Sequence, residues 1–270
     1  MKKCVIYSNC QADGLALFLP MMGFDYQITI YRNYQIILGE QSMADLERDA
    51  KQCDLFIYQP TNDKHGDSSS ENMLTKIPVH AETISFAYVY NHAYFPLTEH
   101  GSKRIGAEFI NEGYWVMPLN ELLSHYDNGT MNFALWPRFL HCLAEQARRE
   151  EHTDLKLTKW MFEHRNERIL LNVNHPTSSM FVELSAQLMW ALEIPVKPFK
   201  ADHLENLTGL PCTLPHSEYV SKEFGIQRQT DHDAHNYYRG LLKGEWLKRQ
   251  AMAGSPNPPV IKPNDELFGG

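Results

Sequence analysis

The chain has 270 residues, of which 43% are hydrophobic, and its formal net charge is −8 at pH 7. A chain of this size can bury a core without disulfide bonds, and its acidic balance argues against a general nucleic-acid-binding protein. The five cysteines are scattered, with no close pair at metal-ligand spacing, which is typical of free thiols in a reducing compartment.

The N-terminus carries a short apolar run that polar Ser8 and Asn9 end too early for a signal peptide. No stretch approaches the roughly 20 apolar residues of a membrane span. The sequence therefore predicts a cytoplasmic protein without a transmembrane segment.

The first ninety residues alternate short apolar or β-branched runs with segments of helical pattern. Such runs, bounded by turn residues, predict buried strands. A Ser that precedes an amphipathic stretch predicts a helix N-cap. This alternation favours a mostly parallel sheet with flanking helices. We expect strands at 4–7, 27–31, 55–58 and 83–90, and helices over 15–22 and 42–53, the second capped by Ser42.

The remainder of the chain is mostly helical in pattern. We expect a single α/β domain over 1–253 that is helix-rich overall, with a helical lobe at about 105–165 and a flexible Pro- and Gly-rich tail over 254–270. Helices are predicted over 105–112, 119–125, 133–151, 155–164, about 177–192 and 231–250, a fifth strand over 168–173, and an irregular segment over 195–215.

Polar clusters follow three of the predicted strands. Because ligands bind at the carboxyl ends of parallel strands, we expect these clusters to share one rim of the sheet. The rim would gain further side chains from the ends of the third and fourth strands. The clusters are Asn9-Cys10-Gln11, Gln59 with Asn62-Asp63, and Asn174-His175; the further side chains are Tyr58, His92 and Tyr94.

The residue types in these clusters suit nucleophilic catalysis. Cys10 precedes a predicted helix, whose N-terminus lowers the pKa of a thiol. Amides of Asn9 and Gln11 can hold an oxyanion, His175 can accept a proton, and Asp63 can orient that histidine. Each pattern also fits an ordinary role: a small buried cysteine, a turn, or a capping loop.

Other motifs give weaker indications of function. The segment 231–235 places Asp and His at one-turn spacing, but acidic residues at a helix start more often stabilise the helix, so no metal site is predicted. Neither a Gly-rich dinucleotide fingerprint nor a P-loop occurs, which argues against the common nicotinamide and nucleoside-triphosphate enzymes.

Three of these motifs resemble a known family. Asn9-Cys10-Gln11 after the first strand, Gln59 after a strand that begins at Cys53-Asp54, and Asn174-His175-Pro176-Thr177 before a helix are together similar to the WcbI-type family of capsule polysaccharide biosynthesis proteins. The resemblance runs from about residue 4 to residue 192. One departure is Ser8, where the family usually has Gly, so the turn before Cys10 is less tight.

The resemblance implies a helix-rich cytoplasmic acyltransferase that binds coenzyme A or acetyl-coenzyme A at a basic site. The acceptor would be a sugar hydroxyl of a polysaccharide precursor. Cys10 and His175 carry over as the catalytic pair, with Gln11, Gln59 and Asn174 as rim residues. Charge and position suggest the coenzyme contacts Arg32, Lys103 and Arg104, together with the rim residues Tyr58, His92 and Tyr94.

The mechanism and the function class stay open at this point. In one mechanism Cys10 carries the acyl group as a thioester. In the other, His175 activates the acceptor hydroxyl for direct attack on the acyl thioester, and Cys10 serves only to position the reactants. An esterase of the SGNH type with Cys in place of Ser is an alternative, although Asn172 stands where that class has Asp. A third possibility is a non-catalytic protein that binds a nucleotide-sugar or an assembly partner. The oligomeric state is also open, a homo-oligomer included.

Overall fold

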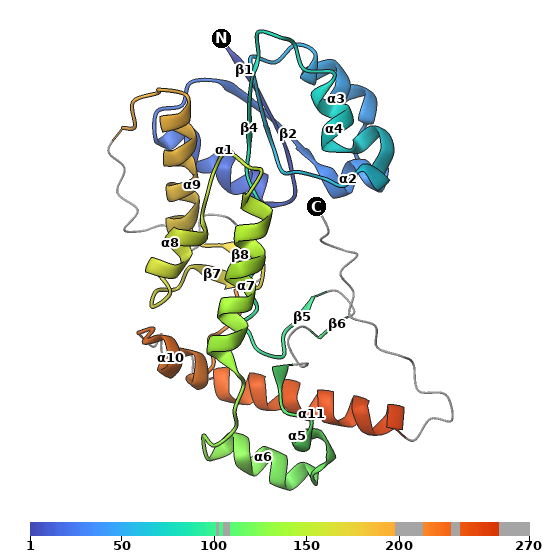
Figure 1. Ribbon diagram of the computed structural model, residues 1–270, viewed down its shortest axis with the longest axis vertical. Coiled ribbons are helices and arrows are strands. Elements are labelled where there is room, and N and C mark those ends of the chain that lie inside the picture. Colours follow the sequence, from blue (N-terminus) through green and yellow to red (C-terminus); the bar gives the residue numbers. More distant parts are fainter. Residues whose placement is uncertain (101–102, 105–108, 198–212, 228–232, 254–270) are drawn as a thin grey trace.

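The computed structural model describes residues 1–100, 103–104, 109–197, 213–227 and 233–253 (Figure 1). The predicted tail over 254–270 and most of the predicted irregular segment over 195–215 lie outside these ranges, as do the side chains of Lys103 and Arg104.

Four parallel strands form the sheet that carries the candidate site, in the order β2-β1-β3-β4. Tyr7 of β1 pairs with Tyr31 of β2 and with Tyr58 of β3, so these three strands end level with one another. The polar segments that follow them therefore start from one edge. The predicted α/β class, with a mostly parallel sheet and flanking helices, is confirmed. The strands are β1 (Lys3–Ser8), β2 (Gln27–Arg32), β3 (Leu55–Tyr58) and β4 (Glu82–Ser85).

Helices cover both faces of this sheet (Figure 1). Alternate residues of β1 enter two cores: Cys4 and Ile6 pack with α1 and α9, whereas Val5 and Tyr7 pack with α3 and α4. Burial on both faces explains why the strand reads as one continuous apolar run. The covering helices are α1 (Gln11–Met21) and α9 (Ser178–Ala191) on one face, and α3 (Met43–Ala50) and α4 (Ser70–Leu74) on the other.

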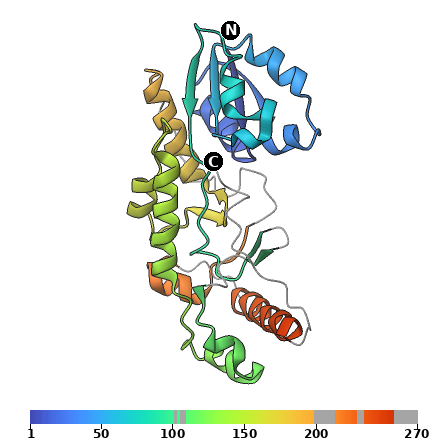
Figure 2. The same ribbon diagram turned by 45° about the vertical axis from the view of Figure 1, so that its right-hand side comes forward.

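The chain after β4 adds a mostly helical part, which lies largely below the sheet in Figures 1 and 2. The first hydrophobic core is continuous into it, through Tyr126, Phe139 and Leu242. Its elements are β5 (Glu99–His100), β6 (Lys103–Arg104), α5 (Gly113–Val116), α6 (Leu119–Asp127), α7 (Leu135–Glu150), α8 (Thr158–Glu163), β7 (Leu170–Asn172), β8 (His175–Pro176), α10 (Glu218–Phe224) and α11 (Ala234–Ala253).

Two expectations about strands were wrong. β4 ends at Ser85, because the chain then leaves the sheet: Phe86 forms an isolated bridge with Leu155, and Val89 bonds to a side chain instead. β7 is not a fifth strand of the main sheet; it pairs antiparallel with the short β8. Hydrophobicity alone marks β7 as buried, but it does not reveal the pairing partner.

Helices differ from expectation at several points. α1 starts directly after Cys10, earlier than predicted, and residues 109–112 of the predicted helix over 105–112 are not α-helical. Sequence reasoning also missed several short helices outside the strong periodic patterns. These are α2 (Asn33–Ile37), the 3₁₀ helix η1 (Asp63–Ser68), α4, α5 and α10.

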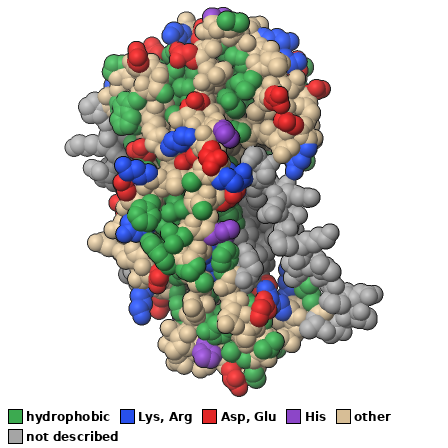
Figure 3. All heavy atoms as spheres, viewed as in Figure 1, with side chains coloured by type: hydrophobic (Ala, Val, Ile, Leu, Met, Phe, Trp, Pro, Cys, Tyr) green, Lys and Arg blue, Asp and Glu red, His purple; other side chains and the backbone are tan. Residues whose placement is uncertain are grey.

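The surface carries charges of both signs. On the face seen in Figure 3, Lys and Arg side chains are interspersed with Asp and Glu rather than gathered in one patch. Among the described segments, none of the helices combines the length and apolar content needed to cross a lipid bilayer.

Gly14 allows α1 and α9 to approach closely. A Cβ atom built on Gly14 would lie 2.3 Å from the ring of Phe181, which itself stacks on Phe18. Cys10 directly precedes α1, and His175 lies just before α9. The contact of Gly14 with Phe181 therefore fixes the relative position of the two chain segments that carry these side chains.

Gly14→Ala is expected to lower the free energy of unfolding by about 1–3 kcal/mol, because the added methyl overpacks the core against Phe181. Gly240 in α11 is the matched control: a Cβ there meets nothing within 4 Å. Gly240→Ala is expected to stabilise the protein by up to about 1 kcal/mol through helix propensity. Urea unfolding of the two variants measures both values, and effects of the same sign would contradict the role of Gly14.

Candidate active site

Cys10 and His175 meet at the edge of the sheet although 165 residues separate them. The Sγ of Cys10 lies 3.4 Å from the Nε2 of His175, and both residues are partly buried. Cys10 is the N-cap residue of α1, whereas His175 lies in β8, just before α9. The packing of α1 on α9 thus brings a thiol and an imidazole into hydrogen-bonding contact.

Asn172 fixes which nitrogen of His175 faces the thiol. Its Oδ1 accepts the backbone N–H groups of Asn174 and His175, each at 3.1 Å, so this atom is the amide oxygen. The same oxygen lies 2.7 Å from His175 Nδ1, which must therefore carry the hydrogen and donate it. In the neutral ring Nε2 is then the nitrogen that carries the lone pair, and it lies in contact with the Cys10 thiol, whose proton it can accept.

The structure gives the orienting role to Asn172 and not to Asp63. Asp63 begins η1 and is exposed, while the Nδ1 of His175 is engaged by Asn172. The prediction for Asp63 was therefore wrong. The signal for Asn172 was its position three residues before His175, where a tight turn returns its side chain to the ring.

The side chains of Gln11 and Gln59 hydrogen-bond to the segments around the site and hold them in place, rather than offer donors to a substrate. The Nε2 of Gln11 donates to the carbonyls of Val89 (3.0 Å) and Asn174 (2.9 Å), so both of its N–H groups are used. Its Oε1 accepts from Gln59 Nε2 at 2.9 Å, and Gln59 Oε1 accepts the backbone N–H of Asn9 at 3.0 Å. The predicted oxyanion role of Gln11 was wrong, because no donor remains.

The side-chain amide of Asn9, the residue before Cys10, retains a donor. Its Oδ1 accepts the backbone N–H of Gln11 at 2.8 Å, and its Nδ2 donates to no acceptor among the described residues. The backbone N–H of Cys10 faces its own sulfur. These two groups can hold a developing oxyanion.

Two other predicted rim residues lie around this centre in different roles. Asn62 caps η1 by accepting the backbone N–H of Lys64 at 2.9 Å and is exposed. Asn174 is buried, and its side chain moderates the pKa of Tyr88, a residue that sequence reasoning missed. Tyr88 lies close enough for Cys10 to affect its pKa, which burial chiefly raises.

The surroundings of Cys10 favour its neutral thiol. Burial raises the pKa of Cys10, and the negative charge of Asp13 raises it further, against opposing effects of the Cys10 backbone N–H and of Arg32. The expected lowering by the helix N-terminus was wrong, because such an end contributes only about 0.3–1 kcal/mol, less than one pKa unit. Attack by Cys10 thus requires a base, and His175 is in contact.

Asp13→Asn is expected to shift the pH dependence of Cys10 alkylation by iodoacetamide to lower pH. Only the thiolate reacts, and removal of a nearby negative charge lowers the pKa of the thiol. The rate is followed against pH, with peptide mass spectrometry to assign the label. Asp63→Asn, a change at an exposed carboxylate of η1, is the control and should leave the profile unchanged; an unshifted Asp13→Asn profile would contradict the assignment.

Two of the predicted coenzyme contacts near the rim are engaged elsewhere. Arg32 forms a two-point ion pair with Asp13, at 2.6 Å and 3.2 Å. Tyr58 stacks on Phe56 and packs with the core beneath α3 and α4.

His92 and Tyr94 are core residues, contrary to prediction. Burial chiefly lowers the pKa of His92 to about 3, with a further contribution from Arg138, so its imidazole is neutral. Tyr94 is fully buried against Phe139 and Phe224, and its hydroxyl donates to the carbonyl of Arg165. Neither side chain can reach a ligand at the rim. Lys103 and Arg104 remain predictions, because their side chains are not described.

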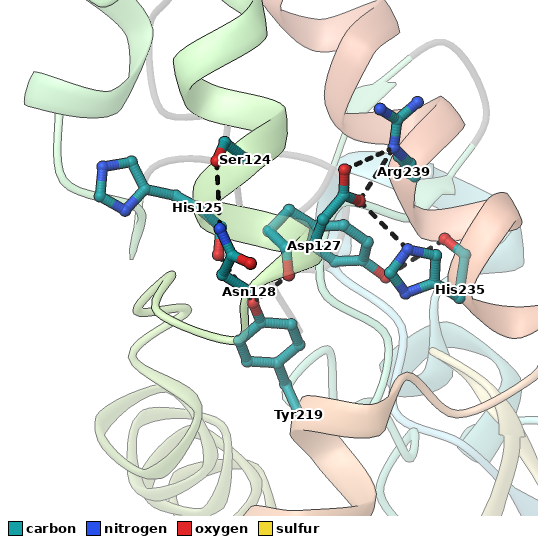
Figure 4. A network of polar contacts seen from close by, with 8 residues as sticks. Ser124, His125, Asp127, Asn128, Tyr219, His235 and Arg239 are labelled. Atoms are coloured by element: carbon teal, nitrogen blue, oxygen red, sulfur yellow. Dashed lines mark hydrogen bonds and ion pairs between the residues drawn. The ribbon is translucent and has the colours of Figure 1, made fainter.

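A second polar cluster lies away from Cys10 and joins α6 to α11 (Figure 4). Asp127 accepts from Arg239 at 2.9 Å and from His235 at 3.1 Å, while Tyr219 donates to the carbonyl of Tyr126. His235 belonged to the segment with metal-ligand residue types. Within the described residues, no three His, Cys, Asp or Glu side chains are grouped to hold a metal ion.

A cavity of about 310 Å³ lies between the α6–α7 connection and α10, lined by Phe133, Trp136 and Tyr219 among others. It contains no residue of the Cys10 centre. Because the titratable and hydrogen-bonding groups suited to chemistry surround Cys10, the candidate active site is placed there and not in this cavity.

Comparison with known proteins agrees with the sequence resemblance. Residues 3–110 match the sequence model of a family described as polysaccharide biosynthesis enzyme WcbI. A solved structure of WcbI, described as a novel polysaccharide biosynthesis enzyme in its native form without a disulfide bond between coenzyme A and one of its cysteines, superposes with a TM-score of 0.68. The alignment has 18% identity and covers 92% of this chain and 90% of that chain.

No curated protein matches the chain. At 18% identity, the likeness to the solved structure establishes the fold. The fold of this chain is thus that of WcbI, and its residues 3–110 carry the sequence pattern of the WcbI polysaccharide biosynthesis enzymes.

Proposed function

We propose that this protein is a coenzyme A-dependent acyltransferase, with acetyl as the expected group and a sugar hydroxyl of a surface polysaccharide precursor as the acceptor. The observation that carries the proposal is the contact of Cys10 Sγ with His175 Nε2 at 3.4 Å, in a tautomer that Asn172 fixes. The coenzyme named for the similar solved structure supports the choice of donor.

The residues around Cys10 suit the carbonyl of a thioester. The backbone N–H of Cys10 faces the sulfur, and Asn9 Nδ2 on the preceding residue is a second donor; both can stabilise the charge that develops on the carbonyl oxygen during attack. Partial burial of Cys10 limits the access of water, which strengthens these electrostatic contacts.

In the first half of the reaction, His175 Nε2 takes the proton of the Cys10 thiol while Sγ attacks the carbonyl carbon of the acyl thioester. The bond between that carbon and the sulfur of coenzyme A then breaks. The departing sulfur receives the proton from His175, which leaves an acyl group on Cys10 and free coenzyme A.

In the second half, His175 Nε2 takes the proton of the acceptor hydroxyl, and the hydroxyl oxygen attacks the acyl carbon on Cys10. The carbon–sulfur bond breaks, and Cys10 recovers its proton from His175. Asn172 keeps Nε2 directed at the reacting atoms through both halves. The thiol, the imidazole and the amide thereby act as nucleophile, base and orienting group.

A thermal-shift screen with coenzyme A and acetyl-coenzyme A tests the proposal. A ligand that binds only the native state stabilises it by about 2.7 kcal/mol at a hundredfold excess over its dissociation constant. We expect a rise in melting temperature with both compounds and none with adenosine alone. No shift with millimolar coenzyme A, together with release of acetate from simple esters, would instead indicate an esterase.

A further inference from the structure

A second set of polar side chains lies on the β2 side of Cys10. Arg32 is the last residue of β2 and pairs in register with Ser8, two residues before Cys10. Asp13 lies in the first turn of α1, three residues after Cys10 and therefore on the same side of the helix. Guanidinium and carboxylate meet at 2.6 Å and 3.2 Å, and each side chain is 30% exposed.

Tyr34 completes this set. It lies in α2, two residues after Arg32, and 41% of the residue is exposed. Burial chiefly raises the pKa of its hydroxyl, and the charges of Arg32, Cys10 and Asp13 also act on that pKa. Tyr34 is thus an exposed aromatic residue in the helix that directly follows Arg32 and the end of β2.

This set does not suit a coenzyme phosphate. The charge of Arg32 is already matched by Asp13. Moreover, the phosphates of coenzyme A are separated from its sulfur by the whole pantetheine arm, whereas Arg32 lies next to the position that the sulfur must reach. A ligand group bound here belongs to the other substrate.

The ion pair of Arg32 and Asp13 retains both hydrogen-bond donors and hydrogen-bond acceptors. Arg32 donates twice to Asp13 and once to Gln35, so two of the five N–H groups of its guanidinium have no acceptor among the described residues. The carboxylate of Asp13 has further lone pairs. Sugar hydroxyls both donate and accept, and the C–H face of a pyranose packs on an aromatic ring.

The two flanks of Cys10 are occupied differently. The loop that carries His175 is held on the opposite flank, where Gln11 binds the Asn174 carbonyl and the Asn91 backbone N–H binds the Val173 carbonyl. A ring placed over β2 can therefore direct one hydroxyl toward Nε2 of His175 while its neighbouring hydroxyls remain over Arg32 and Asp13.

We propose that Asp13, Arg32 and Tyr34 form the acceptor site, and that the acceptor is a pyranose with two neighbouring free hydroxyls beside the one that attacks. This inference rests on the proposed acyl transfer and names its second substrate class. Tyr34 stacks on the ring, and the ion pair binds the two hydroxyls.

Saturation-transfer NMR with a panel of methyl hexopyranosides and their monodeoxy derivatives tests this site without any coenzyme. We expect transfer to the ring protons in the unchanged protein, and affinity at least about tenfold weaker in Tyr34→Ala and in Asp13→Asn, a loss of about 1.4 kcal/mol. Tyr34→Phe should keep the stacking and most of the affinity. Phe162→Ala is the matched control, because Phe162 in α8 has the same 41% exposure.

If the unchanged protein gives no NMR saturation transfer to any of the methyl hexopyranosides, the inference is overturned. Equal affinities in Tyr34→Ala and Phe162→Ala would overturn it as well. Melting temperatures without ligand establish that the variants are folded. The coenzyme A thermal shift, measured on the same samples, decides the proposed acyl transfer separately, so the two failures are distinguishable.

Discussion

His175→Ala is expected to lower the rate of acyl transfer by about 10²–10⁴-fold, the usual contribution of a positioned general base. The loss should be large because burial and Asp13 raise the pKa of Cys10, so that the thiol stays protonated without His175. The residual rate should rise with pH as hydroxide replaces the missing base. Release of free coenzyme A from acetyl-coenzyme A, followed across the pH range, measures the effect.

Two further variants separate catalysis from folding. His80→Ala, a change at an exposed histidine before β4, should leave the rate unchanged. Asn172→Ala should give a smaller loss than His175→Ala, because the base remains but its tautomer and direction are no longer fixed. A His175→Ala protein that binds coenzyme A and retains the full rate would contradict the assignment of the base.

Cys10→Ala is expected to abolish the acyl adduct on the protein and to lower the rate of transfer by roughly 10⁴-fold or more, as loss of a nucleophile does. In the unchanged protein, rapid acid quench after mixing with acetyl-coenzyme A should reveal one added acetyl group by intact-protein mass spectrometry. Peptide mapping should assign that group to Cys10.

Cys142→Ala is the control for loss of a thiol. Cys142 is buried in α7, only 4% exposed, and burial chiefly raises its pKa to about 11. This variant should keep both the adduct and the activity. An unchanged protein that transfers acetyl groups without any adduct, together with an active Cys10→Ala, would favour direct attack by the hydroxyl, with the sulfur as a mere spacer.

The sheet was the most predictable part of the molecule. β1, β2 and β3 are short apolar or β-branched segments bounded by turn residues, and their burial imposes that pattern on the sequence. The end of β4 was not predictable in the same way. Val89 continues the apolar pattern, but its backbone groups bond to the side chain of Gln11, a contact between residues 78 apart in sequence.

The candidate site was predictable in its residue types and less so in their roles. Cys10 was found because it follows a strand of the parallel sheet, where ligands bind. His175 was found on the same rule, but β7 lies outside that sheet, and it is the packing of α1 on α9 that brings His175 to Cys10. The orienting role was predicted for Asp63 instead of Asn172, because the turn over 172–175, which no periodicity encodes, decides which side chain reaches the imidazole. The direction of the pKa shift of Cys10 was missed because the degree of burial is a tertiary property.

The protonated state of Cys10 also bears on how long the protein survives. Peroxides and disulfides attack thiolates far faster than thiols, and oxidation beyond the sulfenic acid is generally irreversible. A sulfur whose proton leaves only when His175 takes it, in contact at 3.4 Å, presents little of the vulnerable form between turnovers. The same arrangement that makes the imidazole indispensable thus shields the resting sulfur from oxidative damage.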